Sequence, residues 1–307
     1  MDSRSSQVTV GVLFLLTVVM GSSNFVAVSF SNQELAPFWG AGLRFSLAGA
    51  LFVVGALFLR LKWPRGRTLA LTALYGLLTF ALSYALLYWA LTQMSAGSAA
   101  VVLAVVPLVT PLLAAAQKLE PLNRRVLAGA VVAFAGIVWM TLDAEGLVIP
   151  MGAVVATLAA SVSIGESVVV SKLIASNHPA MSNAVGMVVG APLLLGLSLA
   201  VGESWSLPTE QETLLAVAYL VTIGSVGLFV ATLLVVRLWT ASATSYMFVL
   251  FPVGAMLLDS WLLDAPLTAR GLSGAIVVMA SVWFGAVSPG AAKRPTAAQS
   301  PRPGSSE

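Results

Sequence analysis

The sequence predicts an all-α integral membrane protein with ten transmembrane helices, arranged as two inverted repeats of five helices each. Hydrophobic residues make up 59% of the 307 residues, charged residues make up 9%, and the mean hydropathy is +0.97. A soluble domain carries roughly 25% charged residues. The apolar residues also form ten runs that are long enough to span a bilayer, and one stretch of sequence recurs at a fixed offset. Most of the surface must therefore face lipid.

The ten predicted spans are separated by short polar breaks. We place them at residues 8–30, 36–60, 68–91, 95–117, 124–142, 149–173, 180–201, 212–237, 243–263 and 268–287. Helices are the expected form, because every backbone polar group inside a bilayer must be satisfied within the protein. The first run follows Arg4 and resembles a signal peptide. It has no clear cleavage site and continues to Phe30, so we interpret it as a retained helix.

The basic residues predict the topology. With the N-terminus in the cytoplasm, the inner segments hold Arg4, Arg60, Lys62, Arg65, Arg67, Lys118, Arg124, Arg125, Lys172, Arg237, Lys293, Arg294 and Arg302. The outer loops hold only Arg270, an asymmetry of 13 to 1. Cytoplasmic loops carry the excess of Lys and Arg in membrane proteins. We therefore expect an even number of spans and two cytoplasmic ends, and we read the net charge of +3 as an orientation signal rather than a nucleic-acid site.

An internal repeat appears at an offset of 145 residues. Of 37 positions aligned without a gap, 11 are identical. The identical pairs include Pro107 with Pro252, Pro121 with Pro266 and Gly129 with Gly274. An odd number of spans in each half inverts one half relative to the other, which is typical of transporters. The predicted units are residues 1–145, 146–289 and a disordered cytoplasmic tail at 290–307.

The chain resembles the EamA repeat of the drug/metabolite transporter superfamily. The resemblance is carried by the stretch from Ala90 to Ala100, by Pro107, Glu120-Pro121-Leu122 and Gly129, by the stretch from Ala241 to Gly274, and by Gly40-Ala-Gly-Leu-Arg44-Phe. It implies a ten-helix inner-membrane transporter that exports amino acids or other metabolites. It also implies a central cavity between the first four helices of each repeat, with the fifth helix outside. The second half departs from the pattern, with Ala265 in place of the acid and no basic partner for Arg44.

Three charged residues lie inside predicted spans, where charge is costly and often functional. Arg44 and Asp259 share the outer leaflet, so a structural pair and a substrate role are both open, with snorkelling as a third reading. Glu166 stands alone in the inner half, where proton coupling, substrate contact and a hydrogen-bonded or Arg237-paired side chain all remain open.

Polar and aromatic residues supply further cavity candidates. Tyr84 and Tyr88 are four residues apart and share one helix face. Tyr246 lies near the start of the ninth span, and Asn24 lies among small residues of the first. A mostly apolar cavity with a few polar groups is the usual small-molecule site. Interfacial aromatics and close helix packing are the alternatives.

The prolines add two gating candidates. Pro107 and Pro252 free backbone carbonyls and kink helices, and they recur in the repeat. The alternative is ordinary transmembrane proline, which is common.

The sequence favours a transporter over an enzyme. There is no Cys, the single His178 cannot anchor a metal cluster, and no nucleotide-binding or nucleophile motif appears. We expect neither cofactor nor metal, and partners limited to a small-molecule substrate and membrane lipid, with a homodimer left open. A secondary exporter of amino-acid-like or amphiphilic metabolites is the leading hypothesis, and a passive facilitator is the alternative.

Overall fold

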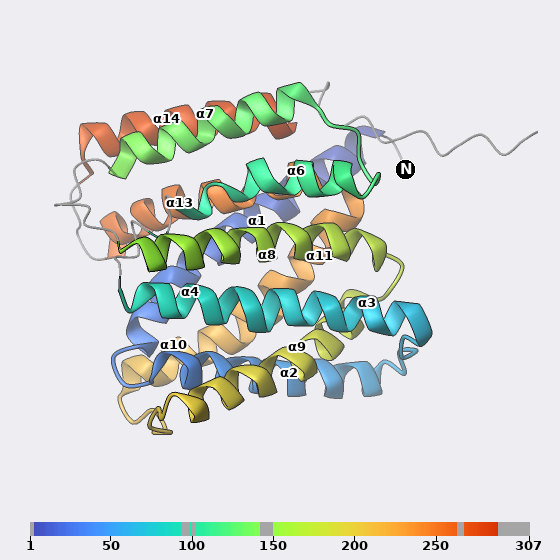
Figure 1. Ribbon diagram of the computed structural model, residues 1–307, viewed down its shortest axis with the longest axis vertical. Helices are drawn as coiled ribbons and strands as arrows, with labels where there is room; N and C mark the ends of the chain where they lie inside the picture. The colour runs from blue at the N-terminus through green and yellow to red at the C-terminus, as the bar shows by residue number, and fades with distance from the viewer. Residues whose placement is uncertain (1–2, 94–98, 100–101, 142–149, 263–266, 288–307) are drawn as a thin grey trace, which may run out of the picture.

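The computed structural model describes residues 3–93, 99, 102–141, 150–262 and 267–287, which are helices joined by short links without a strand among them (Figure 1). The helices are α1 (Ser3–Ser31), α2 (Pro37–Phe58), α3 (Gly66–Gly76), α4 (Ser83–Leu91), α6 (Val106–Ala116), α7 (Arg124–Thr141), α8 (Met151–Leu173), α9 (Pro179–Ala200), α10 (Gln211–Val221), α11 (Leu228–Leu238), α12 (Ala241–Thr244), α13 (Met247–Leu262) and α14 (Ala269–Val282). Three π-helical segments join or extend them, namely η1 (Leu77–Leu82), η2 (Thr222–Gly227) and η3 (Trp283–Val287).

The helices are apolar on their outer faces, as a lipid-facing surface requires. Phe58 is 85% exposed, Met151 76% and Trp261 79%, whereas the buried polar residues are mostly Ser and Thr. Water would penalise such a surface. By length and composition, seven described segments are long enough to cross a membrane, namely Thr9–Val28, Pro37–Phe58, Gly66–Leu91, Met151–Leu173, Pro179–Ala200, Gln211–Leu238 and Ala241–Leu258. Val106–Ala116 and Ala269–Gly285 are shorter apolar helices. The count of ten spans stays a prediction.

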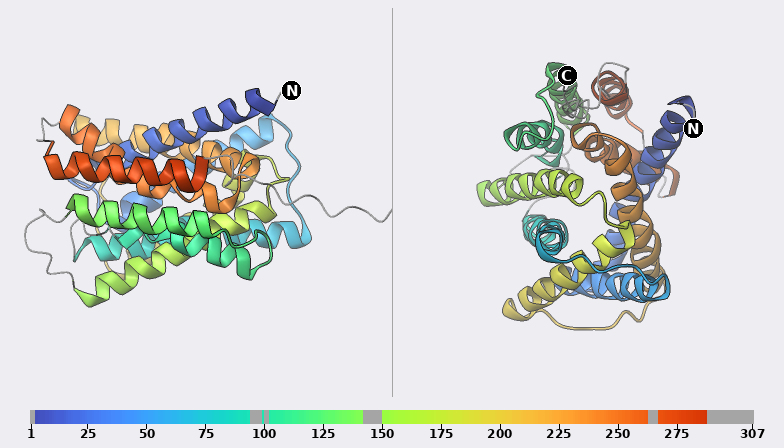
Figure 2. Two further views of the ribbon diagram at one scale, coloured as in Figure 1. Left: turned by 90° about the horizontal axis from the view of Figure 1, so that it is seen from above. Right: turned by 90° about the vertical axis from the view of Figure 1, so that its right-hand side faces the viewer.

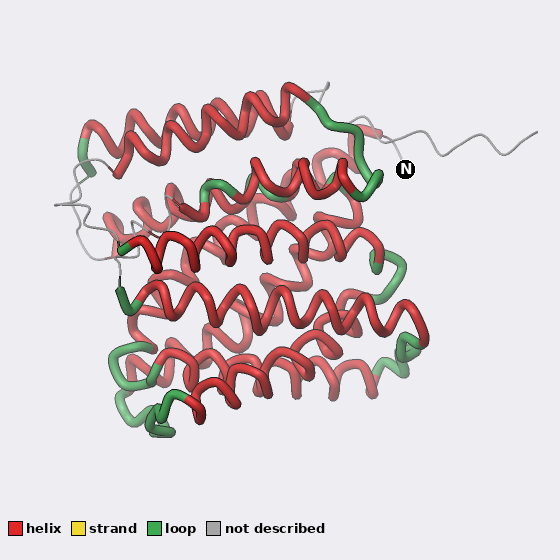
Figure 3. Tube along the Cα trace, viewed as in Figure 1, coloured by secondary structure: helices red, strands yellow, loops and turns green. Residues whose placement is uncertain are grey.

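The described links alternate between the two ends of the bundle (Figures 1 and 3). The links at 59–65, 117–123 and 174–178 lie at the end that carries the N-terminus. The links at 32–36 and 201–210 lie at the opposite end. Which end faces the cytoplasm stays a prediction from the basic residues.

The main helix pairs join the two halves of the chain. α2 packs most extensively on α9, α7 on α14, and α1 on α13. The two halves of the sequence are therefore interleaved rather than set side by side. The pair α7 and α14 lies at one edge of the molecule, away from α2 and α9 (Figures 1 and 2).

Two π segments interrupt the long helices at related places. η1 lies between α3 and α4, and η2 lies between α10 and α11. Their first residues differ by 222 − 77 = 145, which is the offset of the sequence repeat. Helices α3 and α10 begin at the same offset, since 211 − 66 = 145. π turns are rare and frequently mark functional sites.

Two carboxylates, at the end of the bundle away from the N-terminus, each cap the start of a helix from the other half of the sequence. Glu203 accepts hydrogen bonds from the backbone N–H groups of Phe38 at 3.1 Å and Trp39 at 2.7 Å, at the start of α2. Glu34 accepts hydrogen bonds from the Thr209 hydroxyl at 2.6 Å and its N–H at 3.2 Å, just before α10. The hydrogen bond from the Thr209 side chain is the main cause that holds the pKa of the Glu34 carboxyl below its ordinary value. A carboxylate at a helix N-terminus is also favoured by the helix dipole.

Candidate functional site

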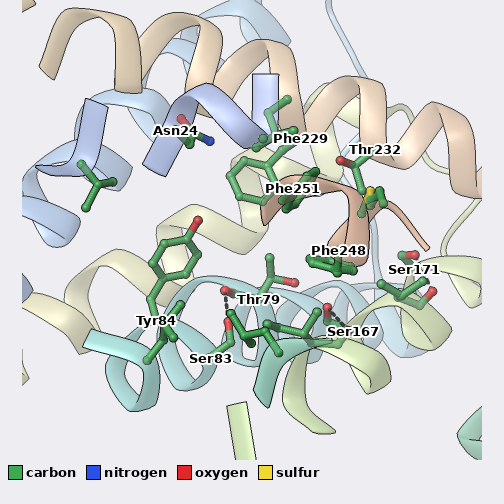
Figure 4. A pocket seen from close by; sticks show the side chains of 18 of the residues that line it. Asn24, Thr79, Ser83, Tyr84, Ser167, Ser171, Phe229, Thr232, Phe248 and Phe251 are labelled. Carbon is green, nitrogen blue, oxygen red and sulfur yellow. Dashed lines mark hydrogen bonds between the residues drawn. The ribbon is translucent and has the colours of Figure 1, made fainter. Parts of the chain in front are cut away.

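A cavity of about 180 Å³ lies between α1, α2, α4, α8, α11, α13 and the π segment η1 (Figure 4). Helices from both halves of the sequence form it. Figure 4 shows Asn24, Phe229 and Phe251 on one side, and Thr79, Ser83 and Ser167 on the other. The lining is mostly apolar, with a few hydroxyl, amide and guanidinium groups. Such a composition is typical of sites for small organic molecules.

Helix α4 contributes a tyrosine pair to the cavity. Tyr84 and Tyr88 face the same way, with their rings stacked at a centroid distance of 6.0 Å. Directly before Tyr84, the Ser83 hydroxyl donates to the carbonyl of Thr79, one helical turn earlier, at 2.6 Å. The Tyr84 hydroxyl points toward the opposite wall in Figure 4. The pair therefore offers both an aromatic surface and a polar group to a ligand.

Helix α8 adds a row of serines that the sequence analysis did not single out. Ser167 and Ser171 line the cavity, and Ser163 donates to the carbonyl of Leu78 in η1 at 3.0 Å. The three serines are four residues apart, so they share one helix face. This four-residue spacing along a mostly apolar span was the signal that could have identified them.

Aromatic rings from the second half close the cavity. Phe229 of α11 lines it, as do Phe248 and Phe251 of α13, whose ring centroids lie 5.4 Å apart. Phe229 also packs edge-on against Phe80 of η1 at 4.7 Å. Edge-to-face ring pairs contribute roughly 0.5–1.5 kcal/mol beyond their area burial. No sequence pattern marked Phe229, since a single Phe in an apolar run carries no signal of which way it faces.

Arg44 of α2 reaches the cavity wall from a buried position. Its side chain is 3% exposed. Its Nε donates to Ser225 Oγ at 2.7 Å, and its Nη2 donates to the Gly224 carbonyl at 2.6 Å. Asn24 of α1 donates its Nδ2 to the same carbonyl at 3.1 Å. Both acceptors belong to η2, so the π segment holds the guanidinium in place.

The structure brings Asn24, Arg44, Tyr84, Tyr88 and Pro252 together around the cavity. It does not bring Glu166, Tyr246 or Pro107 there. Their roles, and those of the lining residues, stay predictions.

Glu166 turns away from the cavity toward α6. Its two carboxylate oxygens accept hydrogen bonds from Gln117 Nε2 at 2.9 and 2.8 Å. Gln117 is exposed, so this pair lies toward the surface of the bundle rather than at its centre. The neighbouring Ser167 points inward instead, because adjacent residues on a helix differ by about 100° in direction.

Tyr246 is fully buried between α12 and α7. Its hydroxyl donates to the carbonyl of Val126, and its ring end lies where a side chain on Gly129 or Gly285 would be. These contacts join the start of α13 to the outer pair α7 and α14. The residue that follows, Met247, is the one that lines the cavity.

The remaining predicted residues are placed by their helices. Pro107 lies in the first turn of α6, where its missing N–H leaves no donor unpaired, and Pro252 lies inside α13. The side chain of Asp259 lies outside the described residues. Helix α13 packs on α1, and α2 packs on α9. The predicted pair of Arg44 with Asp259 therefore stays a prediction.

The described residues hold no group of three His, Cys, Asp or Glu side chains that could bind a metal ion. A bundle of apolar helices around a central, mostly apolar cavity with a few polar groups is the architecture of a membrane transporter for small molecules. The chain belongs to the EamA-like transporter family, whose sequence profile matches residues 9–142 and 151–286.

Curated relatives carry transporter names. An uncharacterized inner membrane transporter, YedA of Escherichia coli K12, is 32% identical over 82% of each chain. A probable amino-acid metabolite efflux pump of Salmonella typhimurium is 32% identical over 89% of this chain and 93% of its own. A probable terminal-alkyne amino-acid exporter of Streptantibioticus cattleyicolor is 26% identical over 85% and 88%. One solved crystal structure superposes with a TM-score of 0.76 at 18% identity, over 90% of this chain and 98% of the other, which shows a shared fold.

Proposed function

We propose that the protein is a secondary transporter that exports small amphiphilic, amino-acid-like metabolites across the inner membrane by alternating access. The observation that carries this proposal is the cavity, because both halves of the chain build it and its lining combines aromatic rings with a few hydroxyl and guanidinium groups. The names of the relatives from Salmonella and Streptantibioticus support an amino-acid-like cargo. In this proposal Asn24, Tyr84 and Tyr88 contact the cargo.

The mechanism rests on two inverted repeats, residues 1–145 and 146–289. Exchange of the two halves' conformations would turn an inward-facing cavity into an outward-facing one. The shared offset of the π segments supports the repeat, as do the two separate family matches. Ten spans with both ends in the cytoplasm complete the proposal, with residues 290–307 as a cytoplasmic tail.

Alternating access needs one end of the cavity to close while the other opens. At the end that carries the N-terminus, Arg237 donates to the carbonyls of Ala175 at 2.6 Å and Asn177. Lys172 donates to the carbonyl of Trp239. These bonds join the ends of α8 and α11, two helices that line the cavity. In our proposal they form the inner gate and break when the cavity opens to the cytoplasm.

A passive facilitator is the second candidate, and one observation favours it. The residues that line the cavity include no Asp or Glu within the described part of the chain, so the cavity itself holds no carboxylate to carry a proton. Proton coupling would then have to act through Glu166, which lies outside the cavity on the α6 side of α8.

Counterflow and uptake in proteoliposomes, with a panel of amino acids and with or without a pH gradient, test the proposal. We expect uptake against a gradient of cargo when a proton gradient is imposed, and a Glu166→Gln variant that binds cargo but has lost the dependence on pH. Uptake that only equilibrates the cargo, at one rate from about pH 6 to 8, would favour the facilitator. Absence of transport for the whole panel would contradict both.

A further inference from the structure

Arg44 is a buried cation whose charge is not neutralised by any described carboxylate. Its two hydrogen-bond acceptors, Ser225 Oγ and the Gly224 carbonyl, are both neutral. The rings of Phe45 and Tyr84 lie 5.0 and 6.0 Å from Cζ, and they orient the guanidinium without neutralising it. Taking a charge out of water is strongly unfavourable unless the charge is paired. The position therefore needs either a function or a counter-ion.

The guanidinium keeps donors for such a counter-ion. Arginine presents five N–H donors in a planar fork. Nε and Nη2 each make one hydrogen bond to η2, whereas Nη1 makes none to any described group. Arg44 also lines the cavity. The open side of the fork is thus available to a molecule in the cavity.

The charge balance of the cavity selects the ligand chemistry. Among the described lining residues Arg44 is the one cation, and there is no Asp or Glu. One guanidinium matches one carboxylate, which it binds through two parallel hydrogen bonds. A phosphate monoester carries nearly two charges at neutral pH and would leave one of them unpaired in a mostly apolar space. A single carboxylate on a mostly apolar body is the acidic group that fits, and the ammonium group of an amino acid would be left to the uncharged hydroxyl oxygens of the lining.

We infer that Arg44 binds the carboxylate group of the transported molecule, while the rings of Tyr84, Phe229 and Phe251 hold its apolar body. This inference rests on the proposed function, because it takes the cavity as the transport path. It assigns the recognition of the head group to one residue. It also gives η2 a role, since the π segment supplies the two acceptors that hold the fork in position.

The test compares an amino acid with its amide, which keeps the α-amino group but lacks the carboxylate. Phenylalanine and phenylalaninamide would compete for counterflow of the best amino acid substrate in proteoliposomes of the full chain. With the wild type, we expect the amide to compete about tenfold to 100-fold more weakly, because a hydrogen-bonded charge pair is lost. Arg44→Gln should weaken competition by the acid by a similar factor and leave competition by the amide nearly unchanged. Arg44→Lys, which keeps the charge but not the fork, should fall between them.

Lys62→Gln is the matched control, because it removes an exposed cation from the loop between α2 and α3. It should keep the wild-type preference for the acid. If Arg44→Gln does not fold, the preference of the wild type for the acid and its reduction in Arg44→Lys still test the inference. Equal competition by acid and amide in the wild type would overturn the inference and leave the transport function standing. Absence of counterflow with every amino acid would overturn the proposed function, and this inference with it.

Discussion

The two π segments meet their neighbours in different ways, although they occupy related positions in the chain. At η2, the side chain of Arg44 on α2 enters the contact and bonds to Gly224 and Ser225. At η1, the neighbour is α9, and Gly186 packs so closely that a side chain on Gly76, the residue directly before η1, would overlap its backbone. The contact of η2 with Arg44 is polar and lies at the cavity. The contact of η1 with α9 is apolar and leaves no space, although Thr79 of η1 also lines the cavity.

The difference suggests a division of labour between the two halves. The contact between η1 and α9 is close-packed and contains no described hydrogen bond that a ligand or water could replace, so it resists separation of its helices. Hydrogen bonds to a side chain can be replaced by bonds to a ligand or to water, so the η2 junction can respond to cargo. The offset of the sequence repeat places Phe80 of η1 opposite Ser225 of η2 in the alignment, because 225 − 80 = 145. Substitutions at these positions compare the junctions directly.

Phe80→Ala should give the largest loss of stability. Phe80 is fully buried, and its ring contacts Phe45 at 5.1 Å and Phe229 at 4.7 Å. Truncation of a buried Phe costs about 3–5 kcal/mol through lost burial and the cavity left behind. Unfolding of the purified protein in detergent measures it. Phe58→Ala, at an 85% exposed ring, is the control, and equal stability of the two variants would contradict a structural η1 junction.

Gly76→Ala should follow, with a loss of about 1–3 kcal/mol, because overpacking forces helices apart. The added methyl group would meet the backbone of Gly186, which cannot rotate away as a side chain can. Gly196→Ala on α9 is the matched control, since nothing lies within 4 Å of the added carbon. That variant should be neutral or more stable by about 0.5–1 kcal/mol. A Gly76→Ala protein as stable as this control would show that the junction is loose.

Ser225→Ala should cost less stability than Phe80→Ala, about 1.5–3 kcal/mol, because one hydrogen bond to a charged group is lost. Its effect should appear in transport, as a weaker apparent affinity for carboxylate cargo. The control is Ser281→Ala, whose hydroxyl donates to the carbonyl of Val278 within its own helix at 2.6 Å. If Ser225→Ala unfolds as readily as Phe80→Ala and leaves the affinity unchanged, the two junctions do not differ in kind.

The smallest effect is expected at Glu34, which caps α10 ahead of the η2 junction. Its carboxyl pKa lies below the ordinary value of 4.5 in the folded protein, chiefly because the Thr209 side chain donates to it. A lowered folded pKa stabilises the protein above the unfolded pKa, and this contribution is lost as the pH falls below 4.5 through the folded value. The thermal midpoint should therefore fall less between pH 5 and 3 in Glu34→Gln than in the wild type. The difference between the two proteins should be small, because the cap is exposed. Parallel curves for the two proteins would show that the cap does not hold α10.

The sequence by itself determined the helical, lipid-facing character of the chain and the register of its repeat. Burial in lipid requires long apolar runs and satisfied backbones, and both leave a direct mark on composition. The i, i+4 spacing was also enough to place Tyr84 and Tyr88 on one face, which the structure turns toward the cavity.

Only the tertiary structure decided which faces meet. In a lipid-facing chain the outside is as apolar as the inside, so hydropathy does not mark the side of a helix that faces the centre. Tyr246 therefore looked like a cavity residue and instead bonds to Val126, and Glu166 pairs with Gln117 on the α6 side. The π segments, and with them the acceptors that hold Arg44, depend on how α2 crosses η2. That crossing is set by packing between residues about 180 positions apart, which no local pattern records.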